Sequence, residues 1–302
     1  MFFQKPISFL KLGNIEIIRI VESETPTSPR FLYPDITPAD IEPFHRWLAP
    51  RFYRPEEFRF NLNIQAFVVR TPHHTLIVDT CVGNHKKRLN PFWNRLETPF
   101  LDRLKDAGVT PENVDFVMCT HLHIDHVGWN TRLVNGRWEP TFPKARYVFN
   151  RDEYEYWKQT GDSEQKNAFH DSVMPVMEAG LAEMVTGEHE ITAGVRLEPT
   201  PGHTPGHCCV HLDGRGALGG TSAGSAGGTA GVITGDMMHT PLQMLQPERS
   251  SGFCADPAQA ADTRRGFLER HAGRDVRIIG THFPDPTAGR VVEEGKGFWL
   301  EG

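Results

Sequence analysis

Residues 120–128 constrain the fold and chemistry of this chain more than any other stretch. They read Thr-His-Leu-His-Ile-Asp-His-Val-Gly, with three imidazoles and one carboxylate inside six residues. Such side chains lose hydration when they pack together and gain no apolar contact, so a fold retains them when a ligand compensates the cost. Imidazole nitrogens and a carboxylate oxygen suit zinc first, with manganese, iron and cobalt as alternatives. A solvated, histidine-rich loop is the competing interpretation.

The spacing within this stretch separates two sets of ligands. In an extended segment alternate residues point the same way, so His121 and His123 converge on one metal while Leu122 enters the core. Asp125 and His126 lie one step further along and are placed for a second metal beside the first. Residues 114–119 form an apolar run that reads as a buried strand. The ligands therefore follow the carboxyl end of a strand, where α/β sheets usually place their sites.

Further ligand-type residues occur in segments far from this stretch. Residues 200–207 read Thr-Pro-Gly-His-Thr-Pro-Gly-His, residues 234–236 Thr-Gly-Asp and residues 280–282 Gly-Thr-His, while residues 76–80 form an apolar strand that ends in Asp79. In this order the motifs resemble those of the metallo-β-lactamase-like superfamily of metal-dependent hydrolases, from about residue 63 to residue 282.

The resemblance implies one α/β domain over residues 1–302, a four-layer αβ/βα sandwich with two metal ions, zinc first, at one edge. The ligands implied are His121, His123 and His203 for the first ion, Asp125, His126 and His282 for the second, and Asp236 between them. Asp79 would orient a ligand imidazole from outside the coordination shell, and His207 would not be a ligand. A hydroxide between the ions would attack the substrate, with Asp125 moving the proton.

The substrate class rests on the segment 235–239, Gly-Asp-Met-Met-His, which resembles methyl parathion hydrolases and their lactonase or esterase relatives. Acyl-homoserine lactonases are similar through the central motif but typically carry a tyrosine where this chain has His239. The expected activity is hydrolysis of a lactone, a carboxylic ester or a phosphotriester in a small molecule. The alternatives are a β-lactam or thioester hydrolase, or an iron-loaded redox or sulfur-oxidising protein. Expected pocket residues are Trp93, Trp129, Met238 and His239, with His239 donating a catalytic hydrogen bond to the substrate.

The amino-acid composition makes some classes of binding partner less favourable than others. The formal net charge is −6, so the sequence offers no strongly basic surface for a nucleic acid. We expect no membrane span and no secretory signal, because no long apolar window is present. Five cysteines without a Cys-x-x-Cys pair favour thiols in a reducing cytoplasm. Residues 23–59 are rich in proline and aromatic residues. They predict either a surface extension with its own small apolar cluster, or a cap over the site or the contact of a homodimer.

Periodicity and capping signals predict the remaining elements. Strands are expected at 14–22, 64–70, 75–79, 146–149, 195–198, 208–212, 232–234 and 276–279, and helices at 37–48, 98–108, 153–158, 168–179 and 256–271. The Lys-Lys-Arg run at 86–88 reads as solvated, as do His73 and His74 at a turn. Residues 214–231 are rich in Gly, Ala, Ser and Thr and predict an extended hairpin tip.

Overall fold

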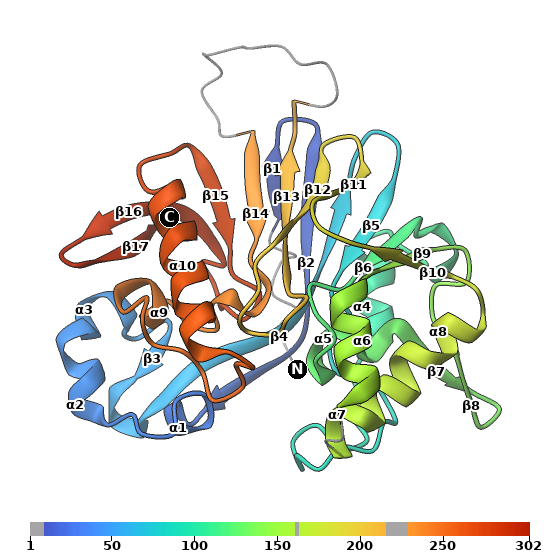
Figure 1. Cartoon of the computed structure of the whole chain (residues 1–302), viewed down its shortest axis with the longest axis horizontal. Helices are drawn as coiled ribbons and strands as arrows, with labels where there is room; N and C mark the ends of the chain where they lie inside the picture. Colours follow the sequence, from blue (N-terminus) through green and yellow to red (C-terminus); the bar gives the residue numbers. More distant parts are fainter. Residues whose placement is uncertain (1–8, 161–162, 216–228) are drawn as a thin grey trace. The chain divides into compact units, whose positions relative to one another are not determined.

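The computed structural model describes residues 9–160, 163–215 and 229–302, and these divide into two compact units (Figure 1). The first unit takes in residues up to 23, residues 64–186 and the start of the segment that follows residue 213. The second unit takes in residues 24–63, 187–213 and the remainder of the chain. Most of the expected hairpin tip at 214–231 lies outside the described residues.

A mixed sheet provides the framework of the first unit. Its strand order is β1 (Phe9–Leu12), β2 (Ile15–Thr27), β4 (Arg59–Arg70), β5 (Thr75–Val78), β6 (Phe116–Met118), β9 (Arg146–Asn150) and β10 (Ala182–Val185). The end of β2 and the start of β4 belong to the second unit, where the short β3 (Tyr53–Arg54) pairs with β4. The strands from β5 to β10 are parallel, whereas β1, β2, β4 and β5 include antiparallel pairs. A separate ribbon is formed by β7 (Thr131–Val134) and β8 (Arg137–Pro140).

Helices pack their apolar side chains on this sheet. They are α4 (Phe100–Asp106), α5 (Ile124–Val127), α6 (Arg151–Gln159), α7 (Ser163–Ala168) and α8 (Met174–Glu178), with a π-helical turn at Phe169–Val173 and 3₁₀ turns at Pro111–Asn113 and Gly128–Asn130. Phe100 of α4 and Trp157 of α6 share one hydrophobic core with Val117 of β6. The N-cap of α6 is Asn150, whose side chain accepts the amide of Asp152 at 2.8 Å.

The second unit has its own sheet, in the order β11 (His189–Thr192), β12 (Val195–Pro199), β13 (Cys208–Asp213), β14 (Ala230–Ile233), β15 (Val276–Ile279), β16 (Ala288–Glu294) and β17 (Gly297–Glu301). Its helices are α1 (Pro29–Leu32), α2 (Pro38–Ile41), α3 (His45–Leu48), α9 (Leu242–Leu245) and α10 (Pro257–His271), with 3₁₀ turns at Glu42–Phe44, Pro55–Glu57 and Gly235–Met237. Phe267 of α10 packs in the same core as Val232 and Ile278 of the sheet.

The regular elements predicted from periodicity are largely confirmed. The last core strand occupies the predicted residues, and α10 begins after Asp256, whose carboxylate accepts the amide of Gln259 at 2.9 Å. The single helix predicted at 37–48 is wrong, because two short helices flank a 3₁₀ turn that contains Pro43. Within residues 23–59, side chains such as Ile41 and Leu48 are buried and join the core of the second unit. The role of these residues as a cap or dimer contact stays a prediction.

The charged run at 86–88 was wrongly predicted to be solvated. Lys86 is fully buried, with Nζ 2.8 Å from Thr131 Oγ1 and 3.3 Å from Asp171 Oδ1. Arg88 donates to the same carboxylate at 2.7 Å. Burial lowers the pKa of Lys86 to about 7, against the attraction of Asp171. Contacts with residues distant in the sequence therefore bury Lys86 and Arg88, whereas Lys87 is exposed. The periodicity of the sequence did not indicate this burial.

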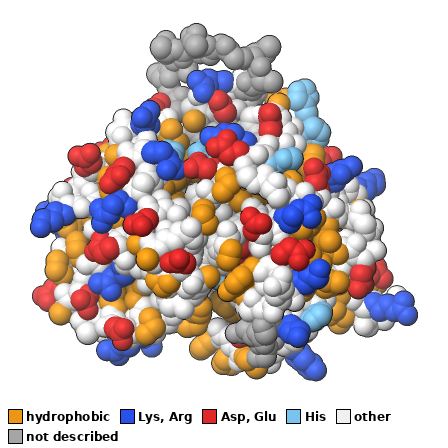
Figure 2. All heavy atoms as spheres, in the orientation of Figure 1, with side chains coloured by type: hydrophobic (Ala, Val, Ile, Leu, Met, Phe, Trp, Pro, Cys, Tyr) orange, Lys and Arg blue, Asp and Glu red, His pale blue; other side chains and the backbone are white. Residues whose placement is uncertain are grey.

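On the face shown in Figure 2, acidic and basic side chains are interspersed. This distribution accords with the formal net charge of −6. Within the described ranges, none of the helices combines the length and the apolar composition needed to cross a bilayer.

Candidate functional site

Asp79 organises the ligand-type residues of the first unit. Strands β5 and β6 are parallel and pair Val78 with Met118, so the residues that follow both strands emerge at one edge. Thr120 donates its backbone amide to Asp79 Oδ1 at 2.8 Å, and its hydroxyl lies 3.0 Å from Oδ2. Asp79 is fully buried and has a φ of 59°, a left-handed conformation that aspartate adopts more readily than most residues.

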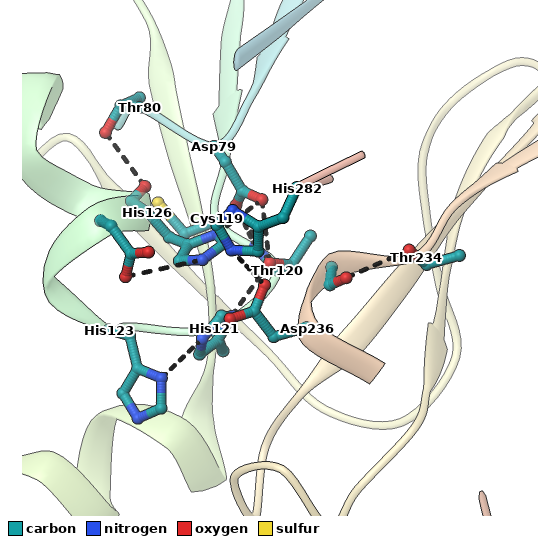
Figure 3. Close-up of polar contacts among 12 residues, drawn as sticks. Asp79, Thr80, Cys119, Thr120, His121, His123, His126, Thr234, Asp236 and His282 are labelled. Carbon is teal, nitrogen blue, oxygen red and sulfur yellow. Dashed lines mark hydrogen bonds and ion pairs between the residues drawn. The ribbon is translucent and has the colours of Figure 1, made fainter. Parts of the chain in front are cut away.

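His126 is oriented by this carboxylate. Its Nδ1 lies 2.9 Å from Asp79 Oδ2 (Figure 3). Because a carboxylate only accepts hydrogen bonds, Nδ1 carries the proton and Nε2 presents its lone pair on the other side of the ring. Asp125 Oδ1 lies 3.7 Å from that Nε2, and the Asp125 side chain retains 13% exposure. The backbone carbonyl of His126 accepts the amide of Thr80 at 2.7 Å, which fixes the first turn of α5.

His121 and His123 converge as the alternation of an extended segment predicts. His121 Nε2 lies 2.9 Å from His123 Nδ1, and Leu122 between them is buried in the core (Figure 3). The Thr120 hydroxyl lies 3.1 Å from His121 Nδ1 and also contacts Asp79, so one carboxylate orients one imidazole directly and a second through a hydroxyl.

Glu153 of α6 is a supporting residue that sequence reasoning missed. It is buried, and its Oε1 accepts the Leu122 amide at 3.0 Å and the Trp157 indole N–H at 2.6 Å. It therefore anchors the backbone between the two histidines. No local signal distinguishes Glu153 from an ordinary acidic residue in the first turn of a helix.

Asp236 is the centre of the ligand-type residues of the second unit. Strands β14 and β15 are parallel and pair Ile233 with Ile279, so Asp236 and His282, each three residues further on, meet at one sheet edge. His282 Nε2 lies 3.0 Å from Asp236 Oδ1. The other nitrogen, Nδ1, lies 2.8 Å from the carbonyl oxygen of Asn63.

This arrangement fits a bound cation. The Asn63 carbonyl only accepts, so His282 Nδ1 carries the proton, and in the neutral ring Nε2 then turns a lone pair toward the Asp236 carboxylate. Two acceptors at 3.0 Å repel each other unless a proton or a cation lies between them. The donor atoms, imidazole nitrogen and carboxylate oxygen, are those of zinc and related divalent ions. The residues present therefore fit a metal ion.

Two more imidazoles face Asp236 Oδ2. His203 Nε2 lies 3.5 Å away, and His203 Nδ1 lies 3.6 Å from the Cys254 thiol. His239 Nε2 lies 3.2 Å away, and the His239 ring is parallel to that of His282. His239 Nδ1 is buried and has no hydrogen-bond partner within the part of the chain that the structure describes.

The residues predicted to line a substrate pocket are buried or partly buried. Trp129 is buried, stacks on Phe100 at 5.2 Å and donates to Glu22 at 2.7 Å, so it belongs to the core of the first unit. Met238 is fully buried in the core of the second unit. Both side chains pack in cores, and their role in a substrate pocket stays a prediction. Trp93 is partly buried against the first core, and its pocket role stays a prediction.

Comparison with known proteins identifies the family. The model of the metallo-beta-lactamase superfamily matches residues 60–218, just over half of the chain. The chain belongs to the metallo-beta-lactamase superfamily. As a member of this superfamily it has the metallo-β-lactamase fold, an α/β architecture, and the fold predicted from its motifs is confirmed.

Among the relatives of this superfamily member are N-acyl homoserine lactonases. One from Bacillus sp is 30% identical over 111 residues, which cover 37% of this chain and 38% of that protein. AttM from Rhizobium radiobacter is 27% identical over 201 residues, which cover 62% of this chain and 65% of that protein. The chain thus spans less than two thirds of the length of these lactonases.

Solved structures extend the similarity in fold to nearly the whole chain. The hydrolase AbOPH of the beta lactamase superfamily superposes with a TM-score of 0.75 at 24% identity, covering 97% of this chain and 96% of that one. AidC, a dizinc quorum-quenching lactonase, superposes with a TM-score of 0.74 at 18% identity, covering 98% and 97%. At sequence identities this low, the structural similarity establishes a common fold and nothing more specific.

Proposed function

We propose that this protein is a metal-dependent hydrolase that opens the ring of a lactone. The observation that carries the metal dependence is the close approach of His282 Nε2 to Asp236 Oδ1 while His282 Nδ1 is held by a carbonyl. The choice of lactones rests on the N-acyl homoserine lactonases among the relatives. The bond cleaved is then the carboxylic ester within the ring.

The proposed centre binds two metal ions through the ligand-type residues that the motifs identify. Asp79 and Thr120 hold the imidazoles of the first unit, and Asn63 holds His282 in the second, so both clusters present unprotonated nitrogens. The set comprises His121, His123 and His203 for one ion, Asp125, His126 and His282 for the other, and Asp236 as the shared carboxylate. The order of these motifs in the sequence resembles that of this superfamily and supports the assignment.

A pair of divalent ions, when bound, supplies Lewis acidity and lowers the pKa of water to about 7. The residues of the chain then orient and transfer protons. Asp125 is suited to move a proton, because its carboxylate lies beside His126 yet keeps contact with solvent. Asp236 fixes the spacing of the imidazoles that face it.

His239 is proposed to contact the substrate as a hydrogen-bond acceptor. A carboxylate only accepts, so the His239 N–H that faces Asp236 is on Nε2, and Nδ1 is left as the acceptor. Lactones with an amide N–H or a hydroxyl in their side chain offer a donor. This polarity is opposite to the donor role expected from the sequence, and it follows from the contact with Asp236.

His239→Ala is expected to keep the metal content and to lower kcat/KM by about 10- to 100-fold, since a lost buried hydrogen bond costs about 1–3 kcal/mol. Metal analysis and steady-state kinetics on the same preparation separate the two effects. His239→Gln, which keeps a polar side chain, is the matched variant. Wild-type kinetics in His239→Ala would remove His239 from the substrate site, and loss of metal would make it a ligand.

The proposed substrate class is tested by measuring ring opening of N-acyl homoserine lactones with the metal-loaded protein. An aryl ester, a phosphotriester, a β-lactam and a glutathione thioester serve as comparison substrates. We expect kcat/KM to be highest for lactones. Preferential hydrolysis of the phosphotriester would replace the lactonase proposal with a phosphotriesterase, and a redox-active iron centre without hydrolysis would reject both.

A further inference from the structure

His207 has both ring nitrogens engaged within the second unit. Its Nε2 lies 3.0 Å from the backbone nitrogen of Asp236. Its Nδ1 lies 3.1 Å from the carbonyl oxygen of Thr200 and 2.9 Å from the Thr200 hydroxyl. A backbone N–H only donates, so Nε2 is the unprotonated nitrogen and Nδ1 carries the proton. The neighbours thus select one neutral tautomer of a fully buried imidazole.

The loop that carries His207 is fixed on its other side by the region around the start of α10. Gly202 has a φ of 127°, and a Cβ there would lie 2.3 Å from the backbone nitrogen of Ala260. Thr263 of α10 donates to the carbonyl of Pro201 at 2.7 Å, and the Ala255 amide donates to the carbonyl of His203 at 2.8 Å. The loop is therefore a rigid support, and His207 joins it to the segment that follows β14.

We propose that His207 is a positioning residue, which fixes the backbone of Asp236 relative to His203. Its contact lies at the amide of Asp236, and the Asp236 carboxylate lies 3.5 Å from the imidazole of His203. The two histidines of the 200–207 motif thus have different roles: His203 is a metal ligand, and His207 holds the backbone of a second ligand. This inference rests on the proposed function, because it takes His203 and Asp236 to be metal ligands.

The backbone around Asp236 explains why such a support is needed. Asp236 lies in a single 3₁₀ turn, Gly235–Met237, with φ −92° and ψ 18°. A turn this short has no helical hydrogen bonds that would hold the amide of its central residue. Without His207 Nε2 as acceptor, this N–H loses that hydrogen bond, and we expect the direction of the carboxylate to be less well fixed.

The experiment measures the dissociation constant for zinc by chelator competition, together with the thermal stability of the metal-free protein. His207→Leu removes the acceptor and is expected to weaken zinc binding by about 10- to 100-fold, the usual effect of losing an outer partner of a metal ligand. His207→Gln places an amide oxygen near the position of Nε2 and is expected to keep most of the affinity. Cobalt substitution provides an absorption spectrum that reports the coordination geometry, and only His207→Leu should change it.

His271→Gln is the matched control. His271 is a buried imidazole of the same unit, with Nδ1 2.8 Å from the carbonyl of Phe267. Its replacement is expected to lower the stability of the metal-free protein and to leave zinc affinity unchanged. Thr200→Val removes the hydroxyl beside His207 Nδ1 and is expected to weaken zinc binding less than His207→Leu does. Combining the two substitutions should add nothing, because they disrupt the same support.

The outcomes separate this inference from the proposed function. Wild-type protein that binds no metal would reject the proposed function. Wild-type protein that binds metal, with equal affinity in His207→Leu, would overturn only the positioning role. Equal loss of affinity in His207→Gln and His207→Leu would also overturn it. If His207→Leu does not fold, wild-type zinc affinity in Thr200→Val decides against the inference.

Discussion

Asp236→Ala is expected to abolish turnover while the fold persists. Asp236 Oδ1 lies 3.0 Å from His282, and Oδ2 lies 3.5 Å from His203 and 3.2 Å from His239. Alanine removes the negative charge that these three imidazoles share in the proposed centre. We expect kcat/KM to fall by more than the factor of about 100 that marks the loss of an outer partner, because a ligand itself is lost.

The fold should tolerate this substitution. Asp236 follows the end of β14 and is not among the side chains of the apolar core of the second unit. Far-ultraviolet circular dichroism should match that of the wild type, and metal analysis should show reduced loading. Asp262→Ala, at an exposed position of α10, is the control with an expected stability change within about 0.5 kcal/mol. Retention of turnover in Asp236→Ala would reject the shared-carboxylate assignment.

Removal of metal by a chelator is expected to abolish activity, and addition of two equivalents of zinc per chain should restore it. The proposed ligands are mostly buried, with His121, His126 and Asp236 almost without exposure, so the metal-free clusters hold polar groups out of water. Metal should also stabilise the fold, by about 4 kcal/mol for each site at a concentration 1,000-fold above its Kd.

The titration of metal into stripped protein gives the stoichiometry directly. Activity and melting temperature are followed as zinc, manganese, iron or cobalt is added. Full activity with a single equivalent would contradict the dinuclear assignment, and activity that survives complete removal would contradict metal dependence. The oxidation state of an iron-loaded sample tests the redox alternative, because zinc does not change its oxidation state in proteins.

The local sequence was sufficient to predict most of the ligand-type residues and the strands that precede them. His121 and His123 converge as the alternation of side chains predicts, with their nearest ring nitrogens 2.9 Å apart. Apolar runs ending in Asp79 and just before Asp236 predicted strands that are followed by ligand-type residues, and the structure has both strands. The order of the motifs also indicated the superfamily, which the family comparison confirms.

Other features depended on contacts between residues far apart in the chain. The Asn63 carbonyl that holds His282 and the Glu153 carboxylate that holds the Leu122 amide carry no local signal, because any residue has a carbonyl and acidic residues are common in helices. The stacking of Trp129 on Phe100 was likewise not indicated by the sequence.

The state of each imidazole was likewise decided by tertiary structure. A sequence lists histidines, but the tautomer of His207 and the polarity of His239 follow from which neighbour can only donate and which can only accept. Sequence therefore determined which side chains are available as ligands. Only the three-dimensional arrangement decided which nitrogen of each ring is left for a metal, because that depends on the hydrogen bond made by the other nitrogen.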